Sequence, residues 1–178
     1  MEKIIRRSNN YIIFDSSFLV SLFDTFSPPH KRALTSFKIL SERKDRLRYV
    51  LPDVVINEST VNLIKTGHDA EKVKERMFKL AMYPKTIINS SDVISAFRHI
   101  APNYSKLLHR NSTSGRMLSN RITKTNDYVI ACTALDHDAI VVGSDKQMLE
   151  CLEMNGIRVF NFLIDDYSLL KRLIEDYS

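Results

Sequence analysis

The sequence is poor in the residues that build several common kinds of site. It has only two cysteines, Cys132 and Cys151, without CxxC spacing, so we expect neither a disulfide framework nor a structural zinc site. Cys132 lies in an apolar segment, which favours a small core residue over a nucleophile. The four glycines form neither GxGxxG nor GxxxxGK(S/T), which excludes the usual nucleotide-binding loops.

Paired histidines and long hydrophobic runs are missing as well. The histidines show no HExxH or other ligand spacing, so we expect surface residues; they are His30, His68, His99, His109 and His137. The first apolar run is interrupted by Asp15 and is too short for a secretory signal or a membrane span. With 178 residues, 44% of them hydrophobic, we expect one domain over residues 1–178 in a soluble, cytoplasmic protein without a membrane segment.

Acidic residues are missing from one long segment. No Asp or Glu occurs between Asp92 and Asp127, although the chain as a whole has a net charge of only +5. The basic residues there are Arg98, Lys106, Arg110, Arg116, Arg121 and Lys124. Such a segment can be an ordinary solvated face, but its position before Asp127 favours phosphate contact. Residues 111–115 have the composition of a loop.

Short apolar segments alternate with amphipathic ones along the chain. Strands are predicted near residues 11–14, 49–51, 85–89, 139–142 and 158–162. Helices are predicted near 16–23, 30–44, 53–66, 69–82, 128–135, 146–154 and 167–174, and a further one begins near residue 90. Strands that alternate with helices indicate an α/β fold, a three-layer α/β/α sandwich with a central, mostly parallel sheet of about five strands.

Carboxylates follow two of the predicted strands and occur in two of the helices. Phe14-Asp15-Ser16 and Gly143-Ser144-Asp145 each place an acid and a hydroxyl at the end of a strand, while Glu58 and Asp127 come from helices. Ligands of open α/β sheets bind at this carboxyl edge. Four carboxylates at one edge would repel one another unless a divalent cation neutralised them. Oxygen ligands of this kind favour Mg²⁺ or Mn²⁺.

Each acid also has a purely structural explanation. Asp15 can be the N-cap of the helix that follows it. Asp127 lies in the first turn of its helix, where negative charge is favourable. Asp145 stands beside Ser144 and Gln147, which have the spacing of a capping box. Glu58 lies on the apolar face of a helix, where an ion pair with a Lys or Arg is an alternative to a role in a site. Only the four acids together indicate a metal site.

The order of these segments resembles the PIN-domain family, which includes VapC-type toxins and RNA-processing nucleases. The matching segments are Ile13-Phe14-Asp15-Ser16-Ser17, Val55-Ile56-Asn57-Glu58, residues 126–134 and Val142-Gly143-Ser144-Asp145. The resemblance implies a PIN-like fold and a catalytic, metal-binding tetrad of Asp15, Glu58, Asp127 and Asp145. It further implies an antitoxin or a larger RNA-processing assembly as partner, and it allows a homodimer. The chain is longer than the compact toxins, and the excess lies in the acid-free segment.

The sequence therefore predicts a Mg²⁺- or Mn²⁺-dependent endoribonuclease. In this hypothesis Asp15, Asp127 and Asp145 hold the metal, and Glu58 orients a water for attack on the phosphodiester. The predicted substrate-binding residues are Ser16, Ser144, Arg116, Arg121 and Lys124. The family resemblance implies RNA as substrate and products with 5′-phosphates. Two alternatives stay open: a PIN-like RNA-binding or scaffold module without catalysis, and a receiver-type phosphoacceptor domain.

Overall fold

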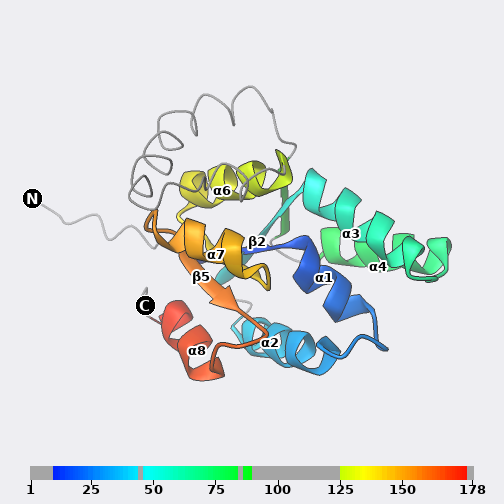
Figure 1. Cartoon of the computed structure of the whole chain (residues 1–178), viewed down its shortest axis with the longest axis horizontal. Coiled ribbons are helices and arrows are strands. Elements are labelled where there is room, and N and C mark those ends of the chain that lie inside the picture. The colour runs from blue at the N-terminus through cyan, green and yellow to red at the C-terminus, as the bar shows by residue number, and fades with distance from the viewer. Residues whose placement is uncertain (1–9, 44–45, 84–85, 90–124, 176–178) are drawn as a thin grey trace, which may run out of the picture.

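One five-stranded sheet forms the centre of the molecule (Figure 1). The structure, a computed structural model, describes residues 10–43, 46–83, 86–89 and 125–175. The strand order is β3-β2-β1-β4-β5, and every neighbouring pair is parallel. The strands are β1 (Asn10–Phe14), β2 (Leu47–Pro52), β3 (Thr86–Asn89), β4 (Ile140–Gly143) and β5 (Arg158–Asn161). The described sheet is thus entirely parallel, where the sequence predicted a mostly parallel one.

Helices flank this sheet, because parallel strands need crossover connections. The described helices are α1 (Ser16–Phe23), α2 (His30–Glu42), α3 (Asp53–Lys65), α4 (Ala70–Ala81), α6 (Thr125–His137), α7 (Lys146–Glu153) and α8 (Tyr167–Glu175). Figure 1 shows α6 on one side of the sheet and α2 with α8 on the other. The predicted three-layer α/β/α sandwich is confirmed.

The strand order places a topological switch point between β1 and β4. From β1 the chain adds β2 and β3 on one side, and it then crosses over to add β4 and β5 on the other. In open parallel sheets, ligands bind outside the carboxyl ends of the strands at such a point. The order also differs from the 2-1-3-4-5 order of receiver-type domains, which speaks against the phosphoacceptor alternative.

The end of β1 is anchored in an aromatic cluster. Phe14 is fully buried and stacks on Phe18 with 4.8 Å between the ring centroids and on Tyr49 with 5.4 Å. Its backbone pairs with Val142 of β4. Because Phe14 is held on all these sides, the chain leaves the sheet at a fixed point, and the residue at that point is Asp15.

Several sequence predictions fall outside the described residues. These are the helix beginning near residue 90, the loop at 111–115, and all six basic residues of the acid-free segment. His99 and His109 lie there as well. Within the described part of the chain, no helix combines the length and apolarity needed to cross a membrane.

Candidate active site

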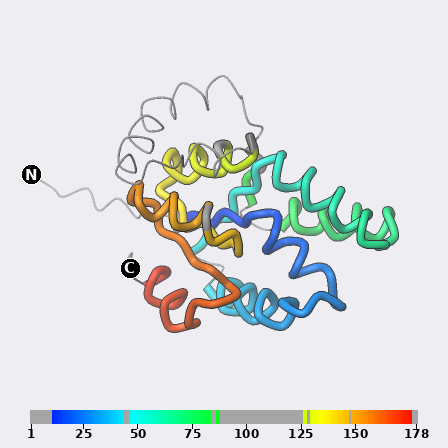
Figure 2. The backbone as a smooth tube through the Cα atoms, in the orientation of Figure 1, coloured from blue at the N-terminus to red at the C-terminus, as the bar shows by residue number. Residues whose placement is uncertain are grey.

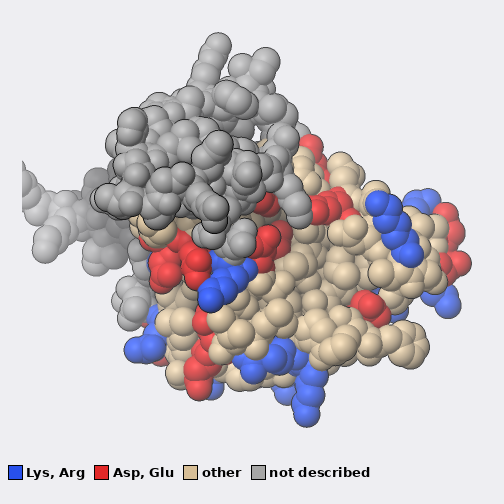
Figure 3. Space-filling view, viewed as in Figure 1, with Lys and Arg blue, Asp and Glu red and all other residues tan. Residues whose placement is uncertain are grey.

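The four predicted acids line one pocket at the carboxyl edge of the sheet, where β1 and β4 end. The pocket has a volume of about 360 Å³. Its described lining residues are Asp15, Ser16, Ser17, Val20, Ser21, Pro29, Glu58, Asn62, Asp127, Ser144, Asp145, Met148 and Leu163. Figure 3 shows Asp and Glu side chains gathered on this face, between α7 and α3. All the charged side chains in the described lining are carboxylates.

Asp15 is the buried member of the group and also the N-cap of α1. Its side chain is 6% exposed, and Oδ1 accepts a hydrogen bond of 2.7 Å from the backbone N–H of Ser16. Burial raises the pKa of Asp15, while hydrogen bonds from Ser17 and Ser16 lower it and the charge of Glu58 raises it further. The structural and the functional interpretation of Asp15 are therefore compatible, since one carboxylate both caps α1 and faces the pocket.

Ser17 links the ends of β1 and β4. Its hydroxyl donates to Oδ2 of Asp15 at 2.6 Å and accepts from the backbone N–H of Ser144 at 3.0 Å. The tube in Figure 2 shows the start of α1 beside the turn between β4 and α7. Ser16, the serine predicted from the sequence, also lines the pocket, but its hydroxyl is 3.4 Å from Asp15 Oδ1. The shorter hydroxyl contact thus belongs to Ser17.

Gly143 allows these two strand ends to approach closely. A Cβ atom added at Gly143 would lie 3.0 Å from Asp15 Cβ and 3.3 Å from Asp15 Oδ2. Glycine suits this position, because a methyl group would be tighter against the Asp15 side chain than an ordinary van der Waals contact. The side chain of Asp15 is consequently confined by β4 on one side and by the start of α1 on the other.

Asp145 directly precedes α7, and Asp127 lies in the first turn of α6. The side chain of Asp145 is exposed, and its Oδ1 accepts from the backbone N–H of Met148 at 3.1 Å. This bond caps α7, a role that the sequence assigned to Ser144. Asp127 is half-buried in the first turn of α6. Its charge, together with the larger effect of burial, raises the pKa of Cys151 to about 11.

Glu58 is held by an amide. It is half-buried in α3, and its Oε2 accepts a hydrogen bond of 3.0 Å from Nδ2 of Asn126, the residue before Asp127. The sequence left an ion pair with Lys or Arg open for this carboxylate. Among the described residues its hydrogen-bond partner is this neutral amide, which does not cancel the charge of the carboxylate.

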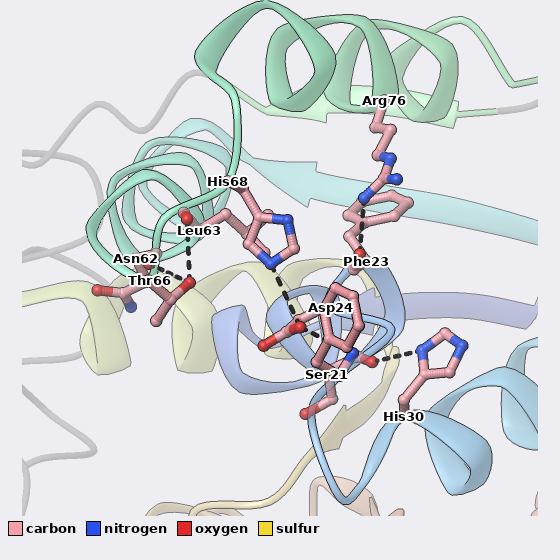
Figure 4. Close-up of polar contacts among 10 residues, drawn as sticks. Ser21, Phe23, Asp24, His30, Asn62, Leu63, Thr66, His68 and Arg76 are labelled. Carbon is pink, nitrogen blue, oxygen red and sulfur yellow. Dashed lines mark hydrogen bonds and ion pairs between the residues drawn. The ribbon is translucent and has the colours of Figure 1, made fainter.

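The far end of α1 is fixed by side chains from three other segments (Figure 4). Protonated or N–H-bearing groups are favourable there, since the carbonyls at the end of a helix carry partial negative charge. The contacts are His30 Nδ1 to Ser21 O at 3.0 Å, Arg76 Nη1 to Phe23 O at 2.7 Å, and His68 Nε2 to Asp24 Oδ1 at 3.3 Å. Because α1 starts directly after Asp15, contacts that hold its far end also restrain the helix that Asp15 caps.

The cysteines are packing residues, as predicted for Cys132. Both side chains are buried, and neither forms a disulfide. Burial, with a smaller contribution from the charge of Asp136, raises the pKa of Cys132 to about 12. A thiol with such a pKa is a poor nucleophile near neutral pH, because the thiolate is the reactive form.

The oxygen atoms that line the pocket are of the chemical types that bind a hard divalent cation. They are carboxylate, hydroxyl and amide oxygens, the ligands that Mg²⁺ and Mn²⁺ prefer. The raised pKa of Asp15 shows that its buried negative charge is costly in the protein alone. Within the described ranges, however, no three Asp, Glu, His or Cys side chains are close enough together to hold one metal ion. The pocket gathers the acids without forming a complete coordination site.

Sequence reasoning missed three residues of this site, namely Ser17, Gly143 and Asn126. Ser17 carried a weak signal, because hydroxyls just after an N-cap often bond to it. The roles of Gly143 and Asn126 depend on contacts between residues far apart in the chain. Arg116, Arg121 and Lys124 lie outside the described residues, so their predicted role in substrate binding stays a prediction.

Comparison with known proteins gives similarity in fold. The sequence matches no protein-family model and no curated protein. The structure is similar to that of VapBC-1 from nontypeable Haemophilus influenzae, with a TM-score of 0.53 and 15% identity, covering 86% of this chain and 99% of that one. It is also similar to that of FitAcB from Neisseria gonorrhoeae, with a TM-score of 0.51 and 14% identity, covering 85% and 98%. This chain therefore shares the fold of the matched chain in each of these two structures, over nearly the whole length of that chain.

Proposed function

We propose that this protein is a Mg²⁺- or Mn²⁺-dependent endoribonuclease that hydrolyses phosphodiester bonds of RNA. One observation carries the proposal: four acids from separate parts of the sequence, Asp15, Glu58, Asp127 and Asp145, line a single pocket at the switch point of the sheet. The resemblance of the sequence motifs to PIN-domain nucleases supports it, and so does the shared fold with VapBC-1 and FitAcB.

The four acids have distinct roles in this proposal. Asp15, Asp127 and Asp145 would hold the divalent cation, which supplies a Lewis acid for a phosphoryl oxygen when it is bound. Glu58 would orient the attacking water and accept its proton. Asp15 is already held by hydrogen bonds from Ser16 and Ser17 and by its packing against Gly143, so its carboxylate would be in place before the cation binds. Such prior positioning lowers the cost of assembling a site.

Recognition of RNA would depend on the cation and on basic residues. The described lining of the pocket contains no Lys or Arg, and four carboxylates repel a phosphate group. We therefore assign phosphate contacts to Arg116, Arg121 and Lys124, with Ser16 and Ser144 as hydroxyl donors near the pocket. The consequence is that RNA binding at the pocket should require the divalent cation.

A cleavage assay with two matched variants tests this function. Asp15→Asn should reduce Mn²⁺-dependent cleavage of single-stranded RNA by at least 100-fold, since removing a charge in the site removes a metal ligand. Asp69→Asn is the control, because Asp69 is also an N-cap, of α4, but lies exposed and away from the pocket. The products should carry 5′-phosphates. Equal cleavage by Asp15→Asn and wild type would rule out the proposal.

The same assay distinguishes the non-catalytic alternative. A scaffold or RNA-binding module would bind RNA in a gel-shift assay but would not cut it with Mg²⁺ or Mn²⁺. Its RNA binding would also survive removal of Asp15 and Asp145. The nuclease proposal predicts the opposite result on both points.

We also propose a protein partner of the antitoxin type. An apolar groove of about 330 Å³ is lined by residues of α1, α2 and α4 and by Tyr83, and its lining includes two cations, Arg76 and Lys79. An apolar segment flanked by acids complements this surface, and Leu34 is 50% exposed there. Leu34→Glu should abolish copurification with the product of an adjacent gene while leaving the circular dichroism spectrum unchanged. Retained copurification would exclude this groove as the docking site.

A further inference from the structure

The bond between Asn126 and Glu58 connects the two helices that bring acids into the pocket from opposite parts of the chain. Asn126 is the second residue of α6 and Glu58 lies in the middle of α3. Nδ2 of Asn126 is 3.0 Å from Oε2 of Glu58, and both side chains are half-buried. The two residues are 68 positions apart. A contact at such a separation is a feature of the folded site and not of local helix geometry.

The orientation of the Asn126 amide follows from its partner. An ionised carboxylate only accepts hydrogen bonds, so the NH₂ group of the amide, and not its oxygen, must face Glu58. Asn in the first turn of a helix commonly bonds to the backbone as a cap. Here the amide donates to Glu58 instead. The amide therefore reaches from the first turn of α6 across to the pocket acid of α3.

A neutral donor suits a carboxylate that must remain available. A Lys or Arg at this position would cancel the charge of Glu58 and would compete with any cation in the pocket. The Asn126 amide fixes one oxygen, Oε2, without cancelling the charge. Carboxylates that act on a metal or on a water are commonly held by such outer hydrogen bonds.

We propose that Asn126 is a positioning residue that fixes the Glu58 carboxylate for the reaction. This inference rests on the proposed nuclease function. The first turn of α6 would then serve the site in two ways. Asp127 lines the pocket directly, and its neighbour Asn126 holds the carboxylate of Glu58 in place. Asn126 itself is absent from the described lining of the pocket. The expected effect of its loss is a lower kcat, with little change in KM for RNA.

Two variants of Asn126 separate positioning from packing. Asn126→Ala removes the hydrogen bond, and Asn126→Asp keeps the shape of the side chain but replaces the donor with a second carboxylate. If donation to Glu58 is what matters, both should lower kcat by about 10-fold or more, the range typical of lost outer hydrogen bonds. An Asn126→Asp variant with a kcat close to wild type would show that donation to Glu58 is not needed.

Asn155→Ala is the matched control. Nδ2 of Asn155 donates to the backbone oxygen of Cys151 at 2.6 Å, and Asn155 is also partly buried but does not line the pocket. This variant loses a comparable amide bond and should keep kcat within twofold. Circular dichroism of all three variants establishes that they are folded before kinetics are compared.

The readout is kcat and KM for Mn²⁺-dependent cleavage of a labelled single-stranded oligoribonucleotide by the full chain. A 10-fold loss of kcat in both Asn126 variants, with KM within twofold, supports the inference. An Asn126→Asp variant within twofold of wild type overturns it and leaves the proposed function standing. A folded wild-type protein that cuts no RNA removes the proposed function, and the inference falls with it.

Discussion

Asp15→Asn should stabilise the metal-free protein at neutral pH, although it removes a residue of the candidate active site. The wild-type carboxylate is 6% exposed, and burial raises its pKa. A buried acid with a raised pKa adds stability only while it is protonated. This contribution is fully present below the ordinary aspartate pKa of 3.8, and it is lost as the pH rises through the higher pKa of the folded state. At pH 7 the buried charge therefore works against folding.

The structure indicates that Asn at position 15 keeps most of the local bonds. Its amide oxygen can accept from the Ser16 N–H, and its NH₂ can donate to the hydroxyl oxygen of Ser17. What disappears is the buried charge and its repulsion with Glu58. A single stabilising substitution of this kind typically raises the free energy of unfolding by about 0.5–2 kcal/mol. For a chain of this size that corresponds to a rise in Tm of roughly 1–8 °C.

Thermal unfolding in EDTA between pH 3.5 and pH 8 measures this effect. The Tm of Asp15→Asn should equal that of wild type at pH 3.5 and should be higher than that of wild type at pH 7. Asp69→Asn should match wild type at pH 7, because Asp69 is an exposed N-cap and Asn caps helices about as well as Asp does. Saturating Mn²⁺ should reverse the order of wild type and Asp15→Asn, since about 100 times the Kd of a bound ligand contributes about 2.7 kcal/mol. A variant that is less stable than wild type at pH 7 in EDTA would refute the reasoning.

Three further outcomes are expected. Ser17→Ala removes a hydrogen bond to the buried carboxylate of Asp15. It should therefore raise the pKa of Asp15 further and lower the free energy of unfolding at pH 7 by about 1.5–3 kcal/mol. Denaturant titration measures this loss, and an unchanged unfolding midpoint would contradict it. Gly143→Ala should lower the free energy of unfolding by about 1–3 kcal/mol, because the added Cβ would lie 3.0 Å from Asp15 Cβ. A denaturation midpoint equal to that of wild type would show that the two strand ends are free to separate. Cys132 and Cys151, with pKa values of about 12 and 11, should react with a thiol reagent at pH 8 only as fast as the protein unfolds; rapid labelling in native buffer would place a thiolate at the surface.

The fold could be predicted from the sequence because its elements are strongly patterned. The strands are short apolar runs bounded by polar residues or turns, as in β1 before Asp15 and β4 before Ser144. Parallel sheets bury both faces of their strands, so such runs are read with little ambiguity. The residues at which helices end were predicted less exactly. The helix α2 ends at Glu42, two residues before the predicted end.

The candidate site could be predicted only in part. Asp15 and Asp145 follow strand ends and Asp127 begins a helix, so the rule that ligands bind at the carboxyl edge brings these three together from the sequence alone. Glu58, in the middle of α3, was added by its place on the apolar face of the helix and by the family resemblance. Their catalytic and metal-binding roles stay predictions. Contacts across the fold could not be predicted, because the closeness of Gly143 to Asp15 depends on the register between Phe14 and Val142. The Asn126 bond to Glu58 likewise depends on how α6 packs near α3.

The central claim is that the four carboxylates of the pocket form one divalent-cation site. Crystals soaked in Mn²⁺ test it directly by anomalous scattering at the manganese edge. The account predicts an anomalous peak in the pocket that contacts Asp15 and at least two of Glu58, Asp127 and Asp145, and that is absent from crystals of Asp15→Asn. A pocket without a peak at saturating Mn²⁺, or a peak that persists in Asp15→Asn, would contradict it.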